Sequence, residues 1–353
     1  MGTIAADAGR VLMIGVGGPA LETEERAILA GLGPAGVVLF RRNLESLSEY
    51  RQLLENLDRT LAQPFVLAVD QEGGRVNRLE RWVGPIPAAA RLAAAGPGAT
   101  FGIGQATGRV LAALGFSLDF APVVDLCSAE ATNGIGDRSF GLDPRRTAEL
   151  AGAFLDGLQA EGVAGCAKHF PGLGATAVDS HHELPVCERD LADLRAVDLV
   201  PFHALAGRAS CVMVSHAAYP AVGDDRRTPA TLSRAIVSGL LRGQVGFGGV
   251  VVTDDMEMGA VAPWDVDGAG AVAAVDAGCD LVLYCSNLAR ALAARDALVR
   301  RAERDPSFAA RLAQAARRAD SLPRSARGDF ERWERRRDDL RAFAAALAAD
   351  PLA

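Results

Sequence analysis

The chain has 353 residues, of which 50% are hydrophobic and 23% are charged, so it can bury a large core. Its formal net charge of −7 argues against nucleic acid and anionic membrane surfaces as partners. The six cysteines are scattered and form no CxxC pair, so we expect reduced thiols rather than a disulfide framework.

The N-terminal stretch MGTIAADAGRVLMIGVGG has an acidic residue early and no basic region before its short apolar run. We therefore expect no secretory signal, no lipid-anchoring cysteine near the start and no acylation. The sequence contains no run of about 18 uninterrupted apolar residues, so no membrane-spanning segment is expected. The expected location is the cytoplasm.

Short apolar runs rich in Val, Leu or Ile recur along the chain, as is typical of parallel strands buried on both faces. The expected strands are 11–16, 36–40, 65–70, 117–126, 163–170, 211–216, 249–255 and 281–285. Helical patterns lie between them, for example at 22–32, 46–61, 143–162 and 231–244. Ser46 and Asp143 are the expected N-caps of two of these helices.

Strands that alternate with helices in this way predict a single (β/α)8 TIM-type barrel, and an open doubly wound sheet is the alternative. The barrel is expected over about residues 10–300, followed by a C-terminal helical extension over 301–353. Its segment 331–351 is typical of a solvated helix with a Trp, Leu and Phe stripe that packs on the barrel. Because no repeat or linker is evident, residues 1–353 are expected to form one catalytic domain.

The glycine-rich stretch IGVGGPA (14–20) follows an expected strand and loosely resembles a dinucleotide-binding turn. Such a site also needs an acidic residue at the end of the next strand, to bind the ribose hydroxyls. That strand instead continues into Arg41 and Arg42. The sequence therefore argues against a nucleotide cofactor.

Polar residues stand at the ends of five expected strands, where the active site of an α/β barrel collects. They are Asp70, Asp125, the pair Lys168 and His169, His216, and Asp254. Asp254 directly follows an apolar run, so it can be held rigidly and stay ionised beside cations, as a nucleophile requires. Its neighbour Asp255 is expected to cap a helix.

Asp179 and His181 are two residues apart, so in an extended segment they project to the same side and can hydrogen-bond. A carboxylate on one ring nitrogen leaves the other nitrogen able to donate a proton, which gives an acid/base device near neutral pH. Gly172 and Gly174 would let this loop move over the site. Metal binding is the competing explanation for the cluster, but neither HxxxH nor HExxH occurs, and we expect no metal.

Five motifs together resemble the family 3 glycoside hydrolases, and specifically their bacterial β-N-acetylhexosaminidase branch, which acts in peptidoglycan recycling. The motifs are DQEGGRVNRL (70–79), FAPVVDL (120–126), GDRSFG (136–141), KHFPG...DSH (168–181) and VVTDDMEM (251–258). They stand in the family's order, and the resemblance covers roughly residues 10–290.

The resemblance implies a retaining exo-β-N-acetylglucosaminidase that removes terminal GlcNAc from peptidoglycan-derived muropeptides by double displacement. It implies Asp254 as the nucleophile, and Asp179 with His181 as a dyad in which histidine replaces the usual acid/base carboxyl group. We expect a small carbohydrate substrate, no cofactor and a monomeric protein. The implied sugar-binding residues are Asp70, Arg78, Arg138, Lys168 and His169.

The loop before the dyad departs from the family pattern. Family members usually read KHFPGHGDT, whereas this chain reads KHFPGLGAT, with Leu173 and Ala175 in place of a histidine and an aspartate. The ordering of the loop, the rate and the aglycone preference are therefore open. The alternatives are a β-glucosidase of the same family, a β-glycoside phosphorylase, and a sugar-binding protein on a catalytically weakened scaffold.

Overall fold

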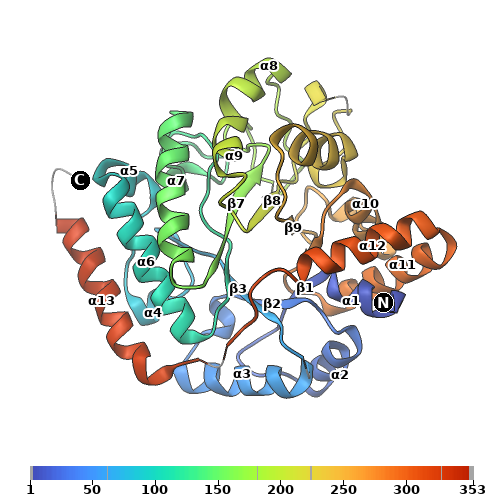
Figure 1. The fold of residues 1–353 in the computed structure, drawn as a ribbon, viewed down its shortest axis with the longest axis horizontal. Helices are drawn as coiled ribbons and strands as arrows, with labels where there is room; N and C mark the ends of the chain where they lie inside the picture. The colour runs from blue at the N-terminus through green and yellow to red at the C-terminus, as the bar shows by residue number, and fades with distance from the viewer. Residues whose placement is uncertain (1–2, 62, 181, 223–224, 327, 350–353) are drawn as a thin grey trace.

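Eight parallel strands form one closed barrel in the computed structural model, which describes residues 3–61, 63–180, 182–222, 225–326 and 328–349 (Figure 1). The strands pair in chain order around the barrel, and the last pairs with the first. Closure confirms the predicted (β/α)8 fold and excludes the open sheet. The barrel strands are β1 (Leu12–Gly15), β2 (Gly36–Leu39), β3 (Val66–Val69), β6 (Leu118–Asp119), β7 (Ala164–Phe170), β8 (Cys211–Val214), β9 (Val250–Asp255) and β10 (Leu281–Tyr284).

Helices surround this barrel and cover the outer faces of its strands (Figure 1). The α-helices are α1 (Ile4–Arg10), α2 (Thr23–Leu32), α3 (Leu47–Leu61), α4 (Glu80–Val83), α5 (Ala89–Ala95), α6 (Pro97–Leu114), α7 (Pro144–Gln159), α8 (Leu191–Asp193), α9 (Leu199–Leu205), α10 (Ala269–Ala277), α11 (Leu288–Arg304), α12 (Pro306–Ala319) and α13 (Phe330–Ala349). Two π-helices, η3 (Leu194–Asp198) and η6 (Ala235–Val245), lie before α9 and before β9. A short antiparallel hairpin, β4 (Gln71–Gly73) and β5 (Val76–Asn77), follows β3.

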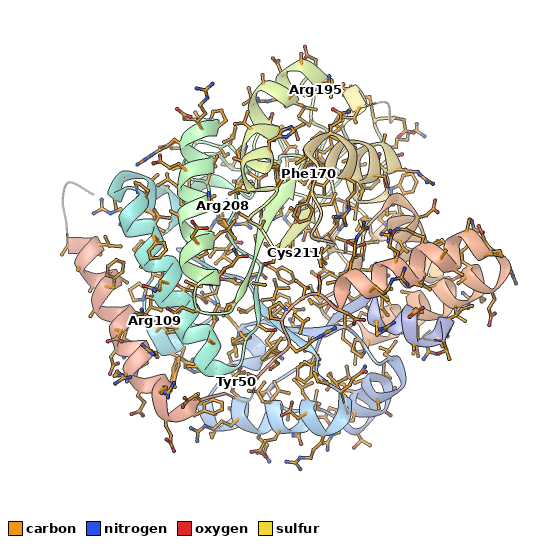
Figure 2. The ribbon with its side chains drawn as sticks, viewed as in Figure 1. Tyr50, Arg109, Phe170, Arg195, Arg208 and Cys211 are labelled. Atoms are coloured by element: carbon orange, nitrogen blue, oxygen red, sulfur yellow. The ribbon has the colours of Figure 1, made fainter. Side chains whose placement is uncertain are left out.

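The strand sequences place alternate side chains in two separate cores. In β10, Leu281 and Leu283 join the cluster inside the barrel, whereas Val282 and Tyr284 join the layer between strands and helices. This alternation explains why each strand is an unbroken apolar run, because both of its faces are buried. In Figure 2 the labelled Phe170 and Cys211 lie among the central strands, and Arg109 and Arg195 lie in the outer layer.

The fourth barrel strand is much shorter than predicted, since β6 ends at Asp119 instead of reaching residue 126. Pro122 follows shortly after, and proline has no N–H to donate to a strand ladder. Only an isolated bridge between Val123 and Lys168 continues the pairing. Asp125 therefore does not end a strand, but it still lies over the barrel.

The predicted caps are confirmed at Ser46 and Asp143 and wrong at Asp255. Ser46 Oγ accepts from the N–H of Glu49, and Asp143 Oδ1 accepts from two N–H groups in the first turn of α7. The chain after Asp255 forms turns instead of a helix. Asp255 Oδ1 accepts from the N–H groups of Glu257 and Cys285.

The C-terminal helix α13 packs along α6, as the apolar stripe in its sequence predicts (Figure 1). Trp333 and Leu340 are buried there, and the Trp333 ring lies 5.9 Å from that of Trp82. A Cβ at Gly102 of α6 would stand only 2.4 Å from the Phe343 ring, so the ring of α13 packs directly on this glycine. No helix among the described residues is long and apolar enough to cross a membrane.

Candidate active site

A cavity of about 210 Å³ lies at the carboxyl ends of the barrel strands, where the sequence predicts the site. It brings together seven of the eight predicted site residues, which are Asp70, Arg78, Arg138, Lys168, His169, Asp179 and Asp254. The eighth, His181, lies outside the described residues. A larger groove of about 880 Å³ between α3 and residues 328–331 contains none of them.

Four buried charges form a compact ion network along one wall of the cavity. Lys168 Nζ lies 2.8 Å from Asp70 Oδ1 and 2.6 Å from Glu72 Oε1. Arg138 holds the Glu72 carboxylate through bonds of 2.8 Å from Nε and 2.9 Å from Nη2. Arg78 approaches Asp70 from outside, at 3.5 Å. Each buried charge is thus balanced by an opposite one, which a buried ion requires.

The network keeps all of its members charged. Burial disfavours the ionised carboxylates of Asp70 and Glu72, but the positive charges of Lys168, Arg78 and Arg138 outweigh burial and lower both pKa values. Burial likewise disfavours the Lys168 ammonium, yet Asp70 and Glu72 raise its pKa above the ordinary value. The cavity wall therefore offers fixed charges to a ligand.

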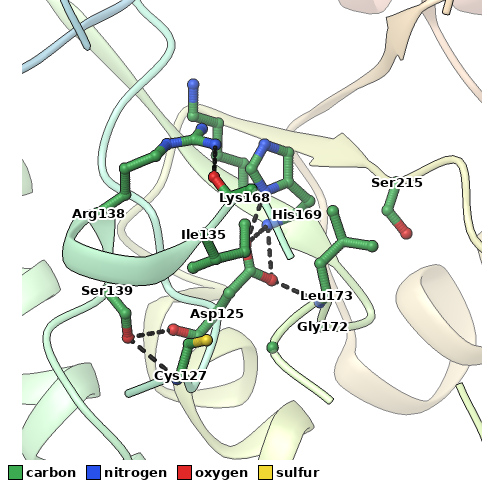
Figure 3. A network of polar contacts seen from close by, with 12 residues as sticks. Asp125, Cys127, Ile135, Arg138, Ser139, Lys168, His169, Gly172, Leu173 and Ser215 are labelled. Atoms are coloured by element: carbon green, nitrogen blue, oxygen red, sulfur yellow. Dashed lines mark hydrogen bonds and ion pairs between the residues drawn. The ribbon is translucent and has the colours of Figure 1, made fainter. Parts of the chain in front are cut away.

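A second network fixes the imidazole of His169 (Figure 3). Asp125 Oδ2 lies 2.6 Å from His169 Nδ1, and the same carboxylate accepts from the N–H of Leu173 at 2.6 Å. Because a carboxylate accepts, Nδ1 carries the proton, and this sets the tautomer and the ring orientation. Asp125 thereby ties the end of β7 to the first residues of the loop that follows.

Asp254 lies near the end of β9, and its Oδ1 accepts from the N–H of Asp255 at 2.8 Å. Burial would raise the pKa of the Asp254 carboxyl, but the charges of His169 and His216, the hydrogen bond from Asp255 and the charge of Lys168 lower it overall. The carboxylate is therefore ionised at neutral pH, which suits a nucleophile.

His216, at the end of β8, supports the strand that carries Asp254. Its Nε2 lies 3.0 Å from the carbonyl oxygen of Asp255, and its Nδ1 lies 2.6 Å from Thr231 Oγ1. A carbonyl only accepts, so Nε2 is the donor in the first bond. Burial lowers the pKa of His216 against the opposing charge of Asp254, and the two ring contacts hold this histidine against the end of β9.

The loop that carries Asp179 packs against the segment that precedes Arg138. A Cβ at Gly134 would stand 2.9 Å from Asp179 Oδ2, so the carboxylate lies directly over that glycine. The next residue, Ser180, accepts at its carbonyl oxygen from the N–H of Ala260, at 3.3 Å. The dyad loop is therefore enclosed by the 133–138 segment on one side and by the segment after β9 on the other.

Sequence reasoning missed Glu72, although a signal was available. Asp70 and Glu72 are two residues apart on the β3–β4 segment, and in an extended chain such residues project to the same side. Asn133 was missed as well, and its contacts join segments about forty residues apart without any local pattern.

The glycine-rich turn and a metal site were the other sites that the sequence raised. The N–H of Gly17 in the glycine-rich turn already donates to Glu25 Oε1 at 2.9 Å, so a phosphate would have to displace that carboxylate. Among the described residues, no group of three or more His, Cys, Asp or Glu side chains is arranged to hold a metal ion.

An ionised carboxylate in a charged cavity, at the carboxyl end of a (β/α)8 barrel, fits glycoside hydrolysis, which is one of the many reactions that this fold supports. The chain belongs to glycosyl hydrolase family 3, because the N-terminal domain of that family matches residues 3–322. The resemblance seen in the sequence motifs is thus confirmed, and the chain is a glycoside hydrolase.

Similar proteins agree with this assignment. A beta-hexosaminidase from Tolumonas auensis is 38% identical over 326 residues, which cover 91% of this chain and 92% of the relative. One from Pseudomonas aeruginosa is 40% identical over 301 residues, which cover 84% and 88%. The crystal structure of a beta-N-acetylhexosaminidase from Beutenbergia cavernae matches with a TM-score of 0.82 at 34% identity, over 91% of this chain and 98% of that one. A family 3 beta-N-acetylglucosaminidase from Paenibacillus matches with a TM-score of 0.86 at 31% identity, over 99% and 68%.

Proposed function

We propose that the chain is a retaining exo-β-N-acetylglucosaminidase that removes terminal GlcNAc from peptidoglycan-derived muropeptides. The observation that carries the proposal is the position of Asp254, whose ionised carboxylate shares one cavity with Lys168 and His169. The names of the curated relatives, beta-hexosaminidase, support an N-acetylated sugar as the substrate.

In the first step, a carboxylate oxygen of Asp254 forms a bond to the anomeric carbon as the bond to the aglycone oxygen breaks. The departing oxygen takes a proton from His181, and the Asp179 carboxylate orients and stabilises the imidazolium. A low pKa suits Asp254 for this role, because only the ionised carboxylate can attack.

In the second step, water gives a proton to His181 and its oxygen bonds to the anomeric carbon, which releases Asp254 as a carboxylate. Two inversions at one carbon retain the configuration. The two steps return every group to its starting charge, so the enzyme needs no cofactor.

The ion network supplies the sugar-binding wall. Asp70 and Lys168 are held in place by Arg78 and Glu72, so they can meet sugar hydroxyls with little loss of side-chain entropy. His169 presents the ring edge opposite its Asp125 contact, and Arg138 completes this wall. We assign substrate binding to Asp70, Arg78, Arg138, Lys168 and His169.

We further propose that residues 1–353 act as one catalytic domain, in which α13 serves as a structural extension, and that the protein works as a monomer in the cytoplasm. The packing of α13 on α6 supports the first of these statements.

The first test measures the release of 4-nitrophenol from its β-N-acetylglucosaminide and its β-glucoside, with and without phosphate. A clear preference for the acetylated sugar is expected, and a preference for the glucoside would favour the β-glucosidase alternative. Acceleration by phosphate, with a glycosyl phosphate as the product, would favour a phosphorylase. No turnover by folded protein would favour a sugar-binding role. Mass spectrometry of a muropeptide digest then decides the natural substrate class.

A further inference from the structure

Asn133 reaches across to the loop that carries the dyad. Its side-chain Nδ2 lies 3.3 Å from the carbonyl oxygen of Leu173, 3.2 Å from that of Gly174 and 3.2 Å from that of Thr176. Asn133 is 7% exposed, so these bonds are largely shielded from water. Two amide protons thus serve three carbonyl groups, of which that of Leu173 also accepts from the N–H and the hydroxyl group of Thr176.

The acceptor side of the same amide is occupied within its own segment. Asn133 Oδ1 accepts from the N–H of Ile135 at 3.2 Å and from Cys127 Sγ at 3.5 Å. This fixes which way the amide points, because the oxygen meets donors and the nitrogen meets carbonyl groups. Asn133 is therefore held by its own segment and directed at the loop.

Two other side chains, those of Tyr219 and Asp125, contact the same loop near its start. Tyr219 donates to the carbonyl oxygen of Gly172 at 2.8 Å, and Asp125 accepts from the N–H of Leu173. Both contacts act within the first three residues after β7. Leu173 and Ala175 have apolar side chains that offer no hydrogen bonds. Asn133 contacts the loop further along, at the carbonyl groups of Gly174 and Thr176, which are nearer in sequence to Asp179.

The neighbouring glycine extends this contact to the dyad itself. Gly134 has φ +86°, and the Asp179 carboxylate occupies the space that a Cβ there would need. We name residues 133 and 134 the 133–134 clasp. Asn133 binds the loop backbone, and Gly134 leaves the space in which the Asp179 carboxylate lies. Arg138 Nη1 in turn donates to the carbonyl oxygen of Gly134 at 3.1 Å, which links the clasp to the ion network.

We propose that Asn133 is a positioning residue for acid/base catalysis, and that the 133–134 clasp sets how long the dyad loop stays in its working position. This inference rests on the proposed function, in which the loop carries the Asp179 and His181 pair. Proton transfer requires a donor within hydrogen-bond reach of the aglycone oxygen, so a loop that opens more often lowers the rate of the step that needs the proton.

The substitution Asn133→Asp tests the proposal with little change in shape. An aspartate keeps an oxygen to accept from Ile135, but it replaces the donor that faces the three carbonyl groups with a second acceptor. The matched control is Asn287→Asp at the N-cap of α11, where the side chain only accepts from the N–H of Arg290. Aspartate caps a helix as well as asparagine does, so this control makes the same chemical change without losing a donor.

The first readout is backbone hydrogen exchange in the free enzyme, which needs no substrate. We expect the amides of residues 172–180 to exchange about tenfold faster in Asn133→Asp than in the wild type, and to be unchanged in Asn287→Asp. Gly134→Ala is a second variant, because its methyl group would displace the Asp179 carboxylate, and the same amides should exchange faster in it. Unchanged exchange in both clasp variants would overturn the proposal.

The second readout is kcat/KM on two N-acetylglucosaminides that differ only in the leaving group, because this constant reports only the steps up to release of the aglycone. We expect Asn133→Asp to lower kcat/KM at least about tenfold on the phenyl glycoside, which needs a proton, and less than about threefold on the 2,4-dinitrophenyl glycoside. Equal losses on both substrates would refute a role in proton transfer. A wild type that cleaves neither substrate would instead overturn the proposed function, while hydrogen exchange still decides whether Asn133 holds the loop.

Discussion

Arg138 forms a bidentate ion pair with the carboxylate of Glu72, with Nε 2.8 Å from Oε2 and Nη2 2.9 Å from Oε1. The side chains are 13% and 6% exposed, so water screens the pair weakly. Lys168 approaches the same carboxylate at 2.6 Å. Glu72 therefore forms ion pairs with two cations of the proposed sugar-binding wall, although the sequence analysis did not include it among the site residues.

Glu72→Gln should destabilise the fold by about 3–5 kcal/mol, because it leaves the Arg138 guanidinium without its paired carboxylate and removes one of the two carboxylates beside Lys168. Urea unfolding measures this change, and kcat/KM on the nitrophenyl substrate should fall with it. The control is Glu80→Gln, which breaks an exposed ion pair with Arg41 and should cost less than about 1 kcal/mol. Equal effects of the two substitutions would show that the buried network does not hold the site.

The sequence predicted best those features that follow from strand periodicity. Parallel strands in register place their carboxyl ends on one rim, so Asp70, Lys168, His169 and Asp254 could be expected to meet before any coordinates were known. The resemblance added Arg78 and Arg138, because no periodicity connects those residues, whereas the two-residue spacing of Asp179 and His181 predicted that pair from the residues alone.

Contacts between loops were beyond such reasoning. Asn133 meets its partners across two irregular segments, and nothing local marks an asparagine that donates to carbonyl groups forty residues away. The early end of β6 had a local cause in Pro122, which the apolar run around it concealed. Local chemistry predicted the caps at Ser46 and Asp143, where the partners are only a few residues apart.

Asp119, at the end of β6, should make stability depend on pH. Its Oδ1 accepts from the N–H of Gln71 at 2.8 Å, and its buried Oδ2 has no hydrogen-bond partner among the described residues. Burial raises the pKa of Asp119 to about 8, against the hydrogen bond from Gln71 and the charge of Lys168. The folded protein thus holds a proton that the unfolded chain loses near pH 4. The stability that the bound proton adds to the folded state is fully present below about pH 4 and is lost as the pH rises to about 8.

Asp119→Asn should remove this dependence, because asparagine keeps the acceptor and carries no charge. The free energy of unfolding of both proteins should be measured from pH 5 to 8. As the pH rises, the stability of the variant relative to the wild type should increase by up to about 1.4 kcal/mol per pH unit. The exposed Asp58→Asn serves as the control, and a gap between wild type and Asp119→Asn that stays constant with pH would contradict the assignment.

His181→Ala should separate substrates by their leaving groups. Removal of the acid/base group slows the cleavage of a phenyl glycoside by about 10²-fold or more, whereas a dinitrophenolate departs without a proton. The second step also loses its base, so an added nucleophile such as azide should speed the variant on activated substrates. Equal losses on both glycosides, with no effect of azide, would rule out an acid/base role for His181.

Asp254→Asn should lower kcat by at least about 10⁴-fold, because the amide retains the shape of the side chain but cannot form the glycosyl intermediate. The fold should be unaffected, since the Asp254 oxygen that accepts from Asp255 is kept. The control is Asp267→Asn on the exposed segment after β9, where φ is +51° and asparagine is well tolerated.

Low pH should lower the activity of the wild type in the same way. The pKa of the Asp254 carboxyl lies below its ordinary value, so the nucleophile stays ionised until the pH falls through that lowered pKa. An Asp254→Asn variant with near-normal turnover would remove Asp254 from the mechanism.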